Sequence, residues 1–227
     1  MNGSIGDIKA IVFDMNGVIV DDEKIHEQAF GLAFIERGLE LTHRQYAELF
    51  LGRTDRDAVE AVCLKRNITI DIGEILNAKK DHYWKLAHNG LVPFPGIVGF
   101  IHESSKRFPI ALASCASSAD IDCVLSAFEI RNLFSVIVSG QDVRKGKPDP
   151  EIYQTAARLL GIAPVNCLAI EDTMIGIRSA QEAGMKCLAV ANTCSRSQLI
   201  KHADIVIDSF QGVSIDILLP AEPPVHV

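Results

Sequence analysis

The sequence predicts an α/β protein whose parallel sheet is interrupted, after the first strand, by a segment made only of helices. From Gly96 onward, short apolar runs alternate with segments of helical periodicity, which is typical of a parallel sheet with right-handed crossovers. Between residues 21 and 92, by contrast, every periodic segment is helical. We therefore divide the chain into an α/β core domain, residues 1–20 and 93–227, and a helical cap domain, residues 21–92.

The first strand is predicted over residues 8–13, an apolar run that is typical of a buried parallel strand. Asp14 follows directly, so its carboxylate is expected at the carboxyl end of the strand, where open α/β sheets hold their ligands. Gly17 allows a tight turn that can present backbone N–H groups to an anion. The prediction at this point of the chain is a carboxylate beside a small anion-binding loop.

Four helices are predicted in the cap segment. The second and third begin after the N-cap candidates Thr42 and Thr54, and the fourth stops before Gly90. The first ends at Gly38. Its apolar residues recur at helical spacing and are expected to face inward: Ile25, Ala29, Leu32 and Ala33. The prolines of residues 93–96 then break any helix and return the chain to the core.

Five further strands are predicted in the core, and all but the last place polar residues at or near their carboxyl ends. They cover residues 110–114, 136–139, 167–171, 186–190 and 205–207. Between the second and third of these, Asp149 as N-cap followed by Pro150 predicts a helix that ends at Gly161. The tail from residue 220 has three prolines and no periodicity, so we expect it to be loose or bound to the surface.

Composition narrows the classes of function. The 227 residues are 48% apolar and 22% charged, and the formal net charge of -7 gives no general attraction to nucleic acid or to an anionic membrane. The chain has no apolar run of membrane-spanning length and no signal-peptide pattern, so we expect a cytoplasmic protein. The six cysteines lack metal-site spacing and are expected to be reduced. The oligomeric state stays open, with a monomer favoured.

The decapeptide VFDMNGVIVD, residues 12–21, resembles the signature of the haloacid-dehalogenase-like phosphohydrolases, Asp-x-Asp-Gly-Val/Thr. The resemblance covers nearly the whole chain and implies a Rossmann-like parallel core with an inserted four-helix cap, as in the subgroup of β-phosphoglucomutase and many sugar-phosphate phosphatases. It implies that Asp14 is the catalytic nucleophile. At the family's second Asp, the general acid/base, this chain has Asn16, whose amide cannot exchange a proton near neutral pH.

Two further motifs complete the catalytic set that the resemblance implies. Ser114, with the N–H of Cys115, is expected to hold the phosphoryl group, although a serine at a strand end can instead cap the next helix. In the segment from Lys145 to Pro150, Lys147 is expected to pair with Asp14 and with phosphoryl oxygens. A carboxylate that attacks a phosphate dianion needs such a cation, because the two negative charges repel each other.

A Mg²⁺ site is expected where Glu171 and Asp172 follow a predicted strand. The resemblance implies that Asp14 and Asp172 supply carboxylate oxygens and Asn16 its main-chain carbonyl, while Glu171 acts through water. Mg²⁺ prefers an oxygen octahedron with few protein ligands, which suits this set. The alternative interpretation is that Asp172 or Thr173 only caps the following helix.

The cap is expected to contribute substrate contacts. Lys79 lies on an otherwise apolar helical stripe, where a charge is out of place unless it snorkels or faces a cleft. His26 lies near the predicted hinge, as a histidine often does in the resembling proteins, although a lone histidine is commonly structural. Asp55 falls where the mutase has an arginine for a distal phosphate, which weighs against mutase activity. The predicted substrate-binding residues are Gly17, His26, Gly52, Arg56, Lys79 and Cys115.

The sequence thus predicts a Mg²⁺-dependent phosphatase that acts on a small phosphorylated metabolite such as a sugar phosphate, through an aspartyl-phosphate on Asp14. Asn16 is expected to impair this activity, whether the residue is natural or engineered. Three alternatives stay open: a β-phosphoglucomutase-like mutase, a non-catalytic protein that binds a phosphorylated ligand, and a dehalogenase or phosphonatase. A dehalogenase would leave the acidic pair Glu171 and Asp172 unexplained.

Overall fold

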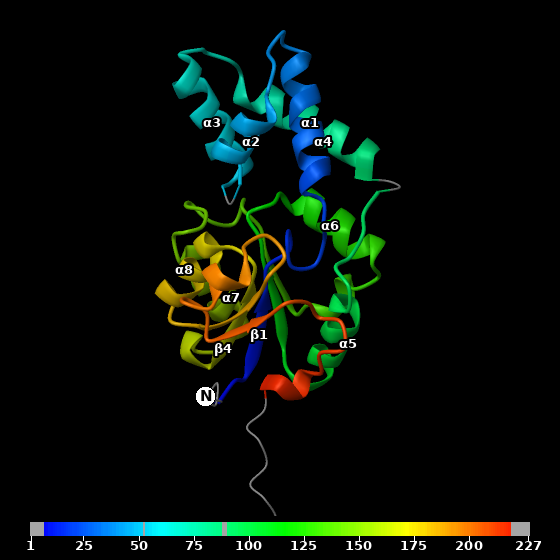
Figure 1. Cartoon of the computed structure of the whole chain (residues 1–227), viewed down its shortest axis with the longest axis vertical. Coiled ribbons are helices and arrows are strands. Elements are labelled where there is room, and N and C mark those ends of the chain that lie inside the picture. The colour runs from blue at the N-terminus through cyan, green and yellow to red at the C-terminus, as the bar shows by residue number, and fades with distance from the viewer. Residues whose placement is uncertain (1–6, 52, 88–89, 219–227) are drawn as a thin grey trace, which may run out of the picture.

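The computed structural model describes residues 7–51, 53–87 and 90–218 and places a helical group beyond one end of a parallel sheet (Figure 1). The six strands are β1 (Ala10–Phe13), β2 (Ile110–Ala113), β3 (Val136–Val138), β4 (Cys167–Glu171), β5 (Lys186–Val190) and β6 (Ile205–Ile207). They pair in the order β3-β2-β1-β4-β5-β6, and all pairs are parallel. The predicted fold class is confirmed.

The position of β1 in this order decides where the polar strand ends meet. Phe13, its last residue, is in register with Leu112 of β2 on one side and with Ile170 of β4 on the other. The residues that follow these strands therefore emerge at one edge of the sheet, beside the switch in strand order where open α/β sheets bind ligands.

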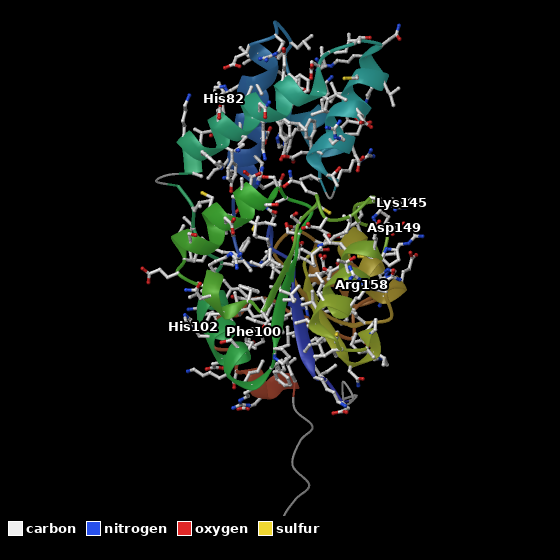
Figure 2. The ribbon with its side chains drawn as sticks, turned by 180° about the vertical axis from the view of Figure 1, so that it is seen from behind. His82, Phe100, His102, Lys145, Asp149 and Arg158 are labelled. Atoms are coloured by element: carbon white, nitrogen blue, oxygen red, sulfur yellow. The ribbon has the colours of Figure 1, made fainter. Side chains whose placement is uncertain are left out.

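Helices cover both faces of the sheet. The core helices are α5 (Ile97–Arg107), α6 (Ser118–Ala127), α7 (Glu151–Leu160), α8 (Met174–Glu182) and α9 (Arg196–Leu199), with short 3₁₀ turns η1 (Arg131–Leu133), η2 (Pro164–Asn166) and η3 (Ile215–Leu218). Ile11 and Phe13 of β1 pack in one apolar cluster with α5 and α6, whereas Ala10 and Val12 pack in a second cluster with α7 and α8. This alternation is expected of a strand that is buried on both faces. Figure 2 shows the two sides from behind, with Phe100 of α5 opposite Arg158 of α7.

Four helices are formed by the described part of residues 21–92, as predicted: α1 (Glu23–Ile35), α2 (His43–Leu49), α3 (Asp55–Arg66) and α4 (Ile72–Ala87). Thr42 and Thr54 cap α2 and α3, since their hydroxyls accept hydrogen bonds from the N–H groups of Gln45 and Asp57. The two connections to the core run side by side, because Val20 bridges to Pro93. We keep residues 21–92 as the proposed limits of the cap domain.

Two predicted details of the helices are wrong. Leu32 is 39% exposed; the buried face of α1 is His26, Ala29, Phe30, Ala33 and Phe34, because Phe30 and Phe34 pack against the ring of Phe50 at centroid distances of 4.5 and 6.5 Å. The N-cap of α7 is Pro150 rather than Asp149, whose carboxylate nonetheless accepts a hydrogen bond from the N–H of Glu151.

Three expectations concern the chain as a whole. All six cysteines are free thiols. No helix in the described parts of the chain combines the length and the apolar character that crossing a membrane requires. The predicted loose tail lies outside the described residues.

Candidate active site

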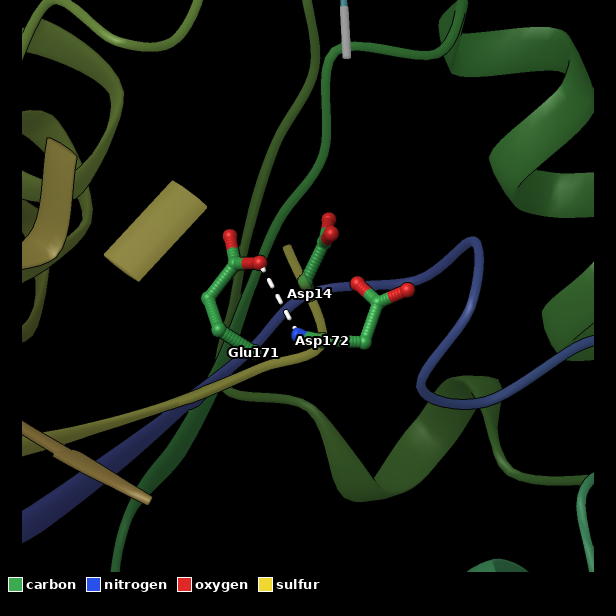
Figure 3. A group of neighbouring side chains, drawn as sticks. All are labelled: Asp14, Glu171 and Asp172. Carbon is green, nitrogen blue, oxygen red and sulfur yellow. Dashed lines mark hydrogen bonds between the residues drawn. The ribbon is translucent and has the colours of Figure 1, made fainter. Parts of the chain in front are cut away.

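Three carboxylates meet where β1 and β4 end. Asp14 follows β1, Glu171 is the last residue of β4, and Asp172 comes next in the chain. Each offers an oxygen atom within 4.8 Å of the others. Figure 3 shows the three side chains rising side by side from the strand ends. This is the acidic group that the sequence predicted.

Lys147 supplies the positive charge at this group. Its Nζ lies 2.9 Å from Asp14 Oδ1 and 2.6 Å from Glu171 Oε1, and the residue is only 8% exposed. Burial alone would lower the pKa of Lys147, but the two carboxylates outweigh it and raise that pKa, so the ammonium stays charged. Lys145, by contrast, is exposed at the surface near Asp149 (Figure 2). The structure thus places Lys147, and not Lys145, against Asp14.

Glu171 is fully engaged by neighbours within the fold. Its Oε1 accepts hydrogen bonds from Lys147 and from the hydroxyl of Tyr153, each at 2.6 Å. Its Oε2 accepts from the N–H of Asp172 at 3.2 Å, the dashed line in Figure 3, and from the hydroxyl of Thr173 at 3.3 Å. Asp14 and Asp172 line the cleft above, whereas Glu171 is completely buried beneath it.

Asp172 has the properties of a cation ligand. Its Oδ1 is buried and has no hydrogen-bond partner among the described residues. Burial, and then the charges of Glu171 and Asp14, raise its pKa well above the usual value. Gly17 adopts φ +78°, and a Cβ at that position would overlap the Asp172 carboxylate. The backbone therefore approaches this carboxylate more closely than any other residue type would permit.

Asp14 is in a similar environment. Burial raises its pKa to about 7, although Lys147 lowers it in part. Ionised carboxylates that are buried close together cost folding free energy unless a cation compensates their charge. Asp14 and Asp172, both facing the cleft, therefore fit a divalent cation that prefers oxygen ligands.

Asn16 is bound to a carboxylate that the sequence analysis did not single out. Its Nδ2 donates a hydrogen bond of 2.7 Å to Asp22 Oδ1 and lies 3.2 Å from His26 Nε2. Asp22 is 1% exposed; it also accepts a hydrogen bond of 2.7 Å from Tyr83 and lies 3.1 Å from His26 Nε2. The signal for Asp22 was its position in the acidic stretch after residue 20, next to the predicted hinge.

Ser114 follows β2 at the same edge of the sheet. It is 1% exposed, and its hydroxyl accepts a hydrogen bond of 3.1 Å from the N–H of Ala116. It does not cap α6, because that function belongs to Ser117. In the segment after β4, the N-cap of α8 is Thr173 rather than Asp172. Ser114 and Cys115 both line the cleft next to Asp14.

Together these residues form one side of a cleft of about 220 Å³ between the sheet edge and the helices of the insertion, which we call the catalytic cleft. Its core side is lined by Asp14, Asn16, Gly17, Ser114, Cys115, Ala116, Lys147, Asp172, Thr173, Asn192 and Thr193. Its cap-facing half includes Asp21, Asp22, Glu23, His26, Phe30, Tyr46, Phe50, Leu51, Arg53, Asp55 and Ala58.

The predicted cap contacts are only partly brought to this cleft. His26 lines it. Lys79 does not, because it is buried between Asp55 and Asp120, with N–O distances of 2.9 and 3.0 Å. Arg56 is exposed and lines a neighbouring cavity. Gly52 lies outside the described residues.

Several residues that line the cleft were not predicted from the sequence, among them Arg53, Asn192 and Thr193. Asn192 and Thr193 follow β5 closely, as the predicted site residues follow their strands, and that position was a usable signal. Asn192 Nδ2 donates a hydrogen bond of 2.7 Å to the carbonyl of Gly17. The choice between Arg53 and Arg56 had no local signal, because it depends on the docking of α3.

Comparison with known proteins agrees with this geometry. The profile of the family described as haloacid dehalogenase-like hydrolase matches residues 11–190. Protein CbbY of Cupriavidus necator is 31% identical over 238 residues, which cover 97% of this chain and 90% of that protein.

Solved structures are similar over nearly the full length. A mutant of CbbY from Rhodobacter sphaeroides, in complex with xylulose-(1,5)bisphosphate, is 29% identical with a TM-score of 0.85, covering 93% of this chain and 99% of that one. β-Phosphoglucomutase from Clostridium difficile is 25% identical with a TM-score of 0.79, covering 92% and 94%. Since the family profile spans well over half of the sequence, the chain belongs to the haloacid dehalogenase-like hydrolase family.

Proposed function

We propose that the protein is a phosphatase that removes phosphate from a small phosphorylated metabolite, such as a sugar phosphate. The observation that carries the proposal is the buried contact of 2.9 Å between Lys147 Nζ and the carboxylate of Asp14, at the carboxyl end of β1. A carboxylate held by a fixed cation at the edge of a parallel sheet is suited to attack phosphorus. The similarity to a CbbY structure that holds a sugar bisphosphate supports a small phosphorylated substrate.

In the proposed mechanism Asp14 attacks phosphorus in line and breaks the bond to the leaving oxygen. Water then attacks the phosphorus of the aspartyl-phosphate, which releases inorganic phosphate and restores Asp14. Lys147 reduces the repulsion between the nucleophile and the phosphoryl oxygens. Glu171 holds Lys147 in place and is itself held by the hydroxyl of Tyr153. Ser114 with the N–H of Cys115 binds the phosphoryl group.

The residues at the cleft fit Mg²⁺. Asp14 and Asp172 would hold it through carboxylate oxygens, of which Asp172 Oδ1 has no other partner among the described residues, and Asn16 through its main-chain carbonyl. Glu171 belongs to the supporting layer, because both of its oxygens are already hydrogen-bonded. When bound, the ion would supply positive charge next to the phosphoryl oxygens.

Asn16 makes this a slow enzyme. Residue 16 has an amide in place of the carboxyl group that would give the leaving oxygen its proton and take one from the attacking water. Both protons must therefore be exchanged with solvent. A positioned acid/base is typically worth about 10²–10⁴ in rate. The amide also favours a second candidate function, a non-catalytic protein that binds a phosphorylated ligand in the same cleft.

Phosphate release from a panel of sugar phosphates and other small phosphomonoesters, with Mg²⁺ and with EDTA, tests the proposal. Asp14→Asn is the matched control, since it removes the nucleophile and keeps the size of the side chain. We expect slow, metal-dependent release by the native protein and none by the variant. Release that persists in Asp14→Asn or in EDTA contradicts the mechanism. Binding by the native protein without release supports the second candidate, and phosphate migration within the sugar indicates a mutase.

A further inference from the structure

The cap-facing half of the catalytic cleft carries more negative than positive charge. Its acidic side chains are Asp21, Asp22, Glu23 and Asp55. Among the described residues, Arg53 is the one lysine or arginine that lines this half. Asp22 is compensated by its contact with His26, but Asp21, Glu23 and Asp55 together outnumber Arg53.

Lys79 does not supply the missing positive charge. It is 1% exposed, and its ammonium lies between the carboxylates of Asp55 and Asp120. Two carboxylates around one ammonium leave a net negative charge in that group. The burial that would otherwise lower the pKa of Lys79 is outweighed by Asp55 and Asp120, so the lysine stays protonated and paired.

Asp55 is the member of this group that faces the substrate. It lines both the catalytic cleft and the neighbouring cavity, whereas Lys79 and Asp120 line only the cavity. Its side chain is 31% exposed, compared with 2% for each of its two neighbours in the group. A leaving group in the cleft therefore meets the carboxylate of Asp55 and is separated from the ammonium behind it.

We propose that the cleft selects phosphomonoesters whose leaving group carries no second phosphate, and that Asp55 determines this specificity. The proposal rests on the phosphatase function proposed above. A second phosphate on the leaving group would face Asp55, Glu23 and Asp21 with Arg53 as its one compensating cation, and like charges brought together at a binding site disfavour the complex strongly. A neutral or amine-bearing alcohol avoids this repulsion.

The size of the cleft agrees with this selection. Its volume of about 220 Å³ is below the roughly 300–1,000 Å³ that is common for ligand pockets. Phe30, Tyr46 and Phe50 form an apolar wall on the cap side, and such a wall offers no hydrogen-bond donors to phosphate oxygens except the hydroxyl of Tyr46, which donates to Glu23 at 2.5 Å.

Paired ligands test the proposal. Fructose 6-phosphate is compared with fructose 1,6-bisphosphate, and glucose 6-phosphate with glucose 1,6-bisphosphate, by calorimetric binding to the native protein in Mg²⁺ and by phosphate release. Because Asn16 is expected to make turnover slow, binding can be measured before much of the substrate is hydrolysed. The variant is Asp55→Asn. The control is Asp57→Asn, which changes the same charge two residues further along α3, at an exposed position that does not line the catalytic cleft.

We expect the native protein and Asp57→Asn to bind and hydrolyse each monophosphate at least about tenfold better than its bisphosphate, and Asp55→Asn to lose most of that ratio. Equal or better use of the bisphosphates overturns the proposal and leaves the phosphatase function standing. A preference for monophosphates that Asp55→Asn does not change overturns the assignment to Asp55. If the native protein neither binds nor hydrolyses any phosphate ester, the phosphatase function itself fails.

Discussion

Asn16 and Asp22 have to be considered as a pair. The family signature alone points to a missing acid at position 16, whereas the structure shows that the amide at this position donates to a buried carboxylate 2.7 Å away. An aspartate at position 16 would bring two carboxylates into contact. Like charges at such a distance raise the pKa of the pair, because the two groups cannot both ionise at low cost.

The first prediction exchanges these two residues. We expect Asn16→Asp to raise turnover by at least about tenfold, since a general acid/base is restored. The double variant Asn16→Asp/Asp22→Asn removes the second charge, so the pKa of the new acid falls and the acid limb of the pH–rate profile moves to lower pH than in the single variant. Profiles of both variants measured from pH 4.5 to 9 check this. Coincident profiles would show that Asp22 does not act on residue 16.

Lys147 gives a second prediction. Lys147→Met leaves Glu171 and Asp14 buried without their cation, and breaking a buried ion pair typically costs about 3–5 kcal/mol in the free energy of unfolding. We expect that loss together with loss of phosphatase activity. Lys145→Met, at a 74% exposed side chain, should change stability by no more than about 0.5 kcal/mol.

A second-site variant separates stability from catalysis at Lys147. Lys147→Met/Glu171→Gln removes one of the unpaired charges, so its stability in urea denaturation should recover while activity stays absent. If Lys147→Met is as stable as the native protein, then Lys147 is not the cation that compensates Glu171.

The residues at the strand ends could be predicted because their positions depend on local pattern. Asp14, Ser114, Glu171 and Asp172 each follow a short apolar run, and parallel strands bring their carboxyl ends to one edge. The contacts of Asn16 with Asp22 and of Lys79 with Asp120 could not be predicted in this way. They depend on how the four inserted helices dock on the core, and no local pattern encodes that docking.

Among the elements, α4 and α6 are joined by a buried ion pair. Lys79 of α4 and Asp120 of α6 lie 3.0 Å apart and are both nearly fully buried, and they connect the inserted helices to the core. Near the same boundary, a Cβ at Gly146 would collide with the side chain of Thr54, the N-cap of α3. The insertion thus contacts the core closely at both positions.

The third prediction concerns this link. Asp120→Asn removes one carboxylate from Lys79, and we expect a loss of about 3 kcal/mol in the free energy of unfolding, at the lower end of the range for a broken buried pair because Asp55 remains. Limited proteolysis in the cap should become faster. Asp122→Asn, on the same helix, removes only an exposed pair with Arg131 and should cost less than about 1 kcal/mol. Equal effects of the two variants would argue against a special contribution of Asp120.

The helices also show what hydrophobic periodicity alone cannot predict. The strands β4, β5 and β6 have the predicted ends, because buried parallel strands are continuous apolar runs. In α1, two different sets of apolar residues recur at helical spacing. One set includes Leu32, and the other includes Phe30 and Phe34. The second is buried, because stacking of Tyr46 on Phe50, at a centroid distance of 4.9 Å, completes an aromatic cluster contributed by two helices.

For the whole molecule, the buried carboxylates link stability to pH and to Mg²⁺. The pKa of Asp14 is about 7 in the folded protein, compared with a usual value of 3.8. Between these pH values the folded state binds more protons than the unfolded state, so this group makes the protein less stable as the pH rises from about 4 to about 7. Asp172, whose pKa is also raised, acts in the same direction.

The fourth prediction follows from this linkage. Mg²⁺ competes with protons for carboxylate oxygens, so its binding should strengthen as the pH rises. We expect the increase in the melting temperature on adding Mg²⁺ to be small at pH 5.5 and larger at pH 8. Thermal unfolding with Mg²⁺ and with EDTA at both pH values measures it, and Asp172→Asn should reduce the effect. An increase that is the same at both pH values, or larger at pH 5.5, would contradict the assignment of these carboxylates to the metal.

The central position of β1 affects how the protein is made. During synthesis β1 is produced before the other strands of the sheet, and its neighbours, β2 and β4, begin only at Ile110 and Cys167. The four inserted helices are therefore translated, and able to fold, before β2 and β4 exist to pair with the apolar strand β1. Such long-range pairing is slow and leaves hydrophobic surface open to aggregation. Nascent chains stalled after residue 92 should accordingly bind chaperones through β1, and chains stalled after β4 should release them.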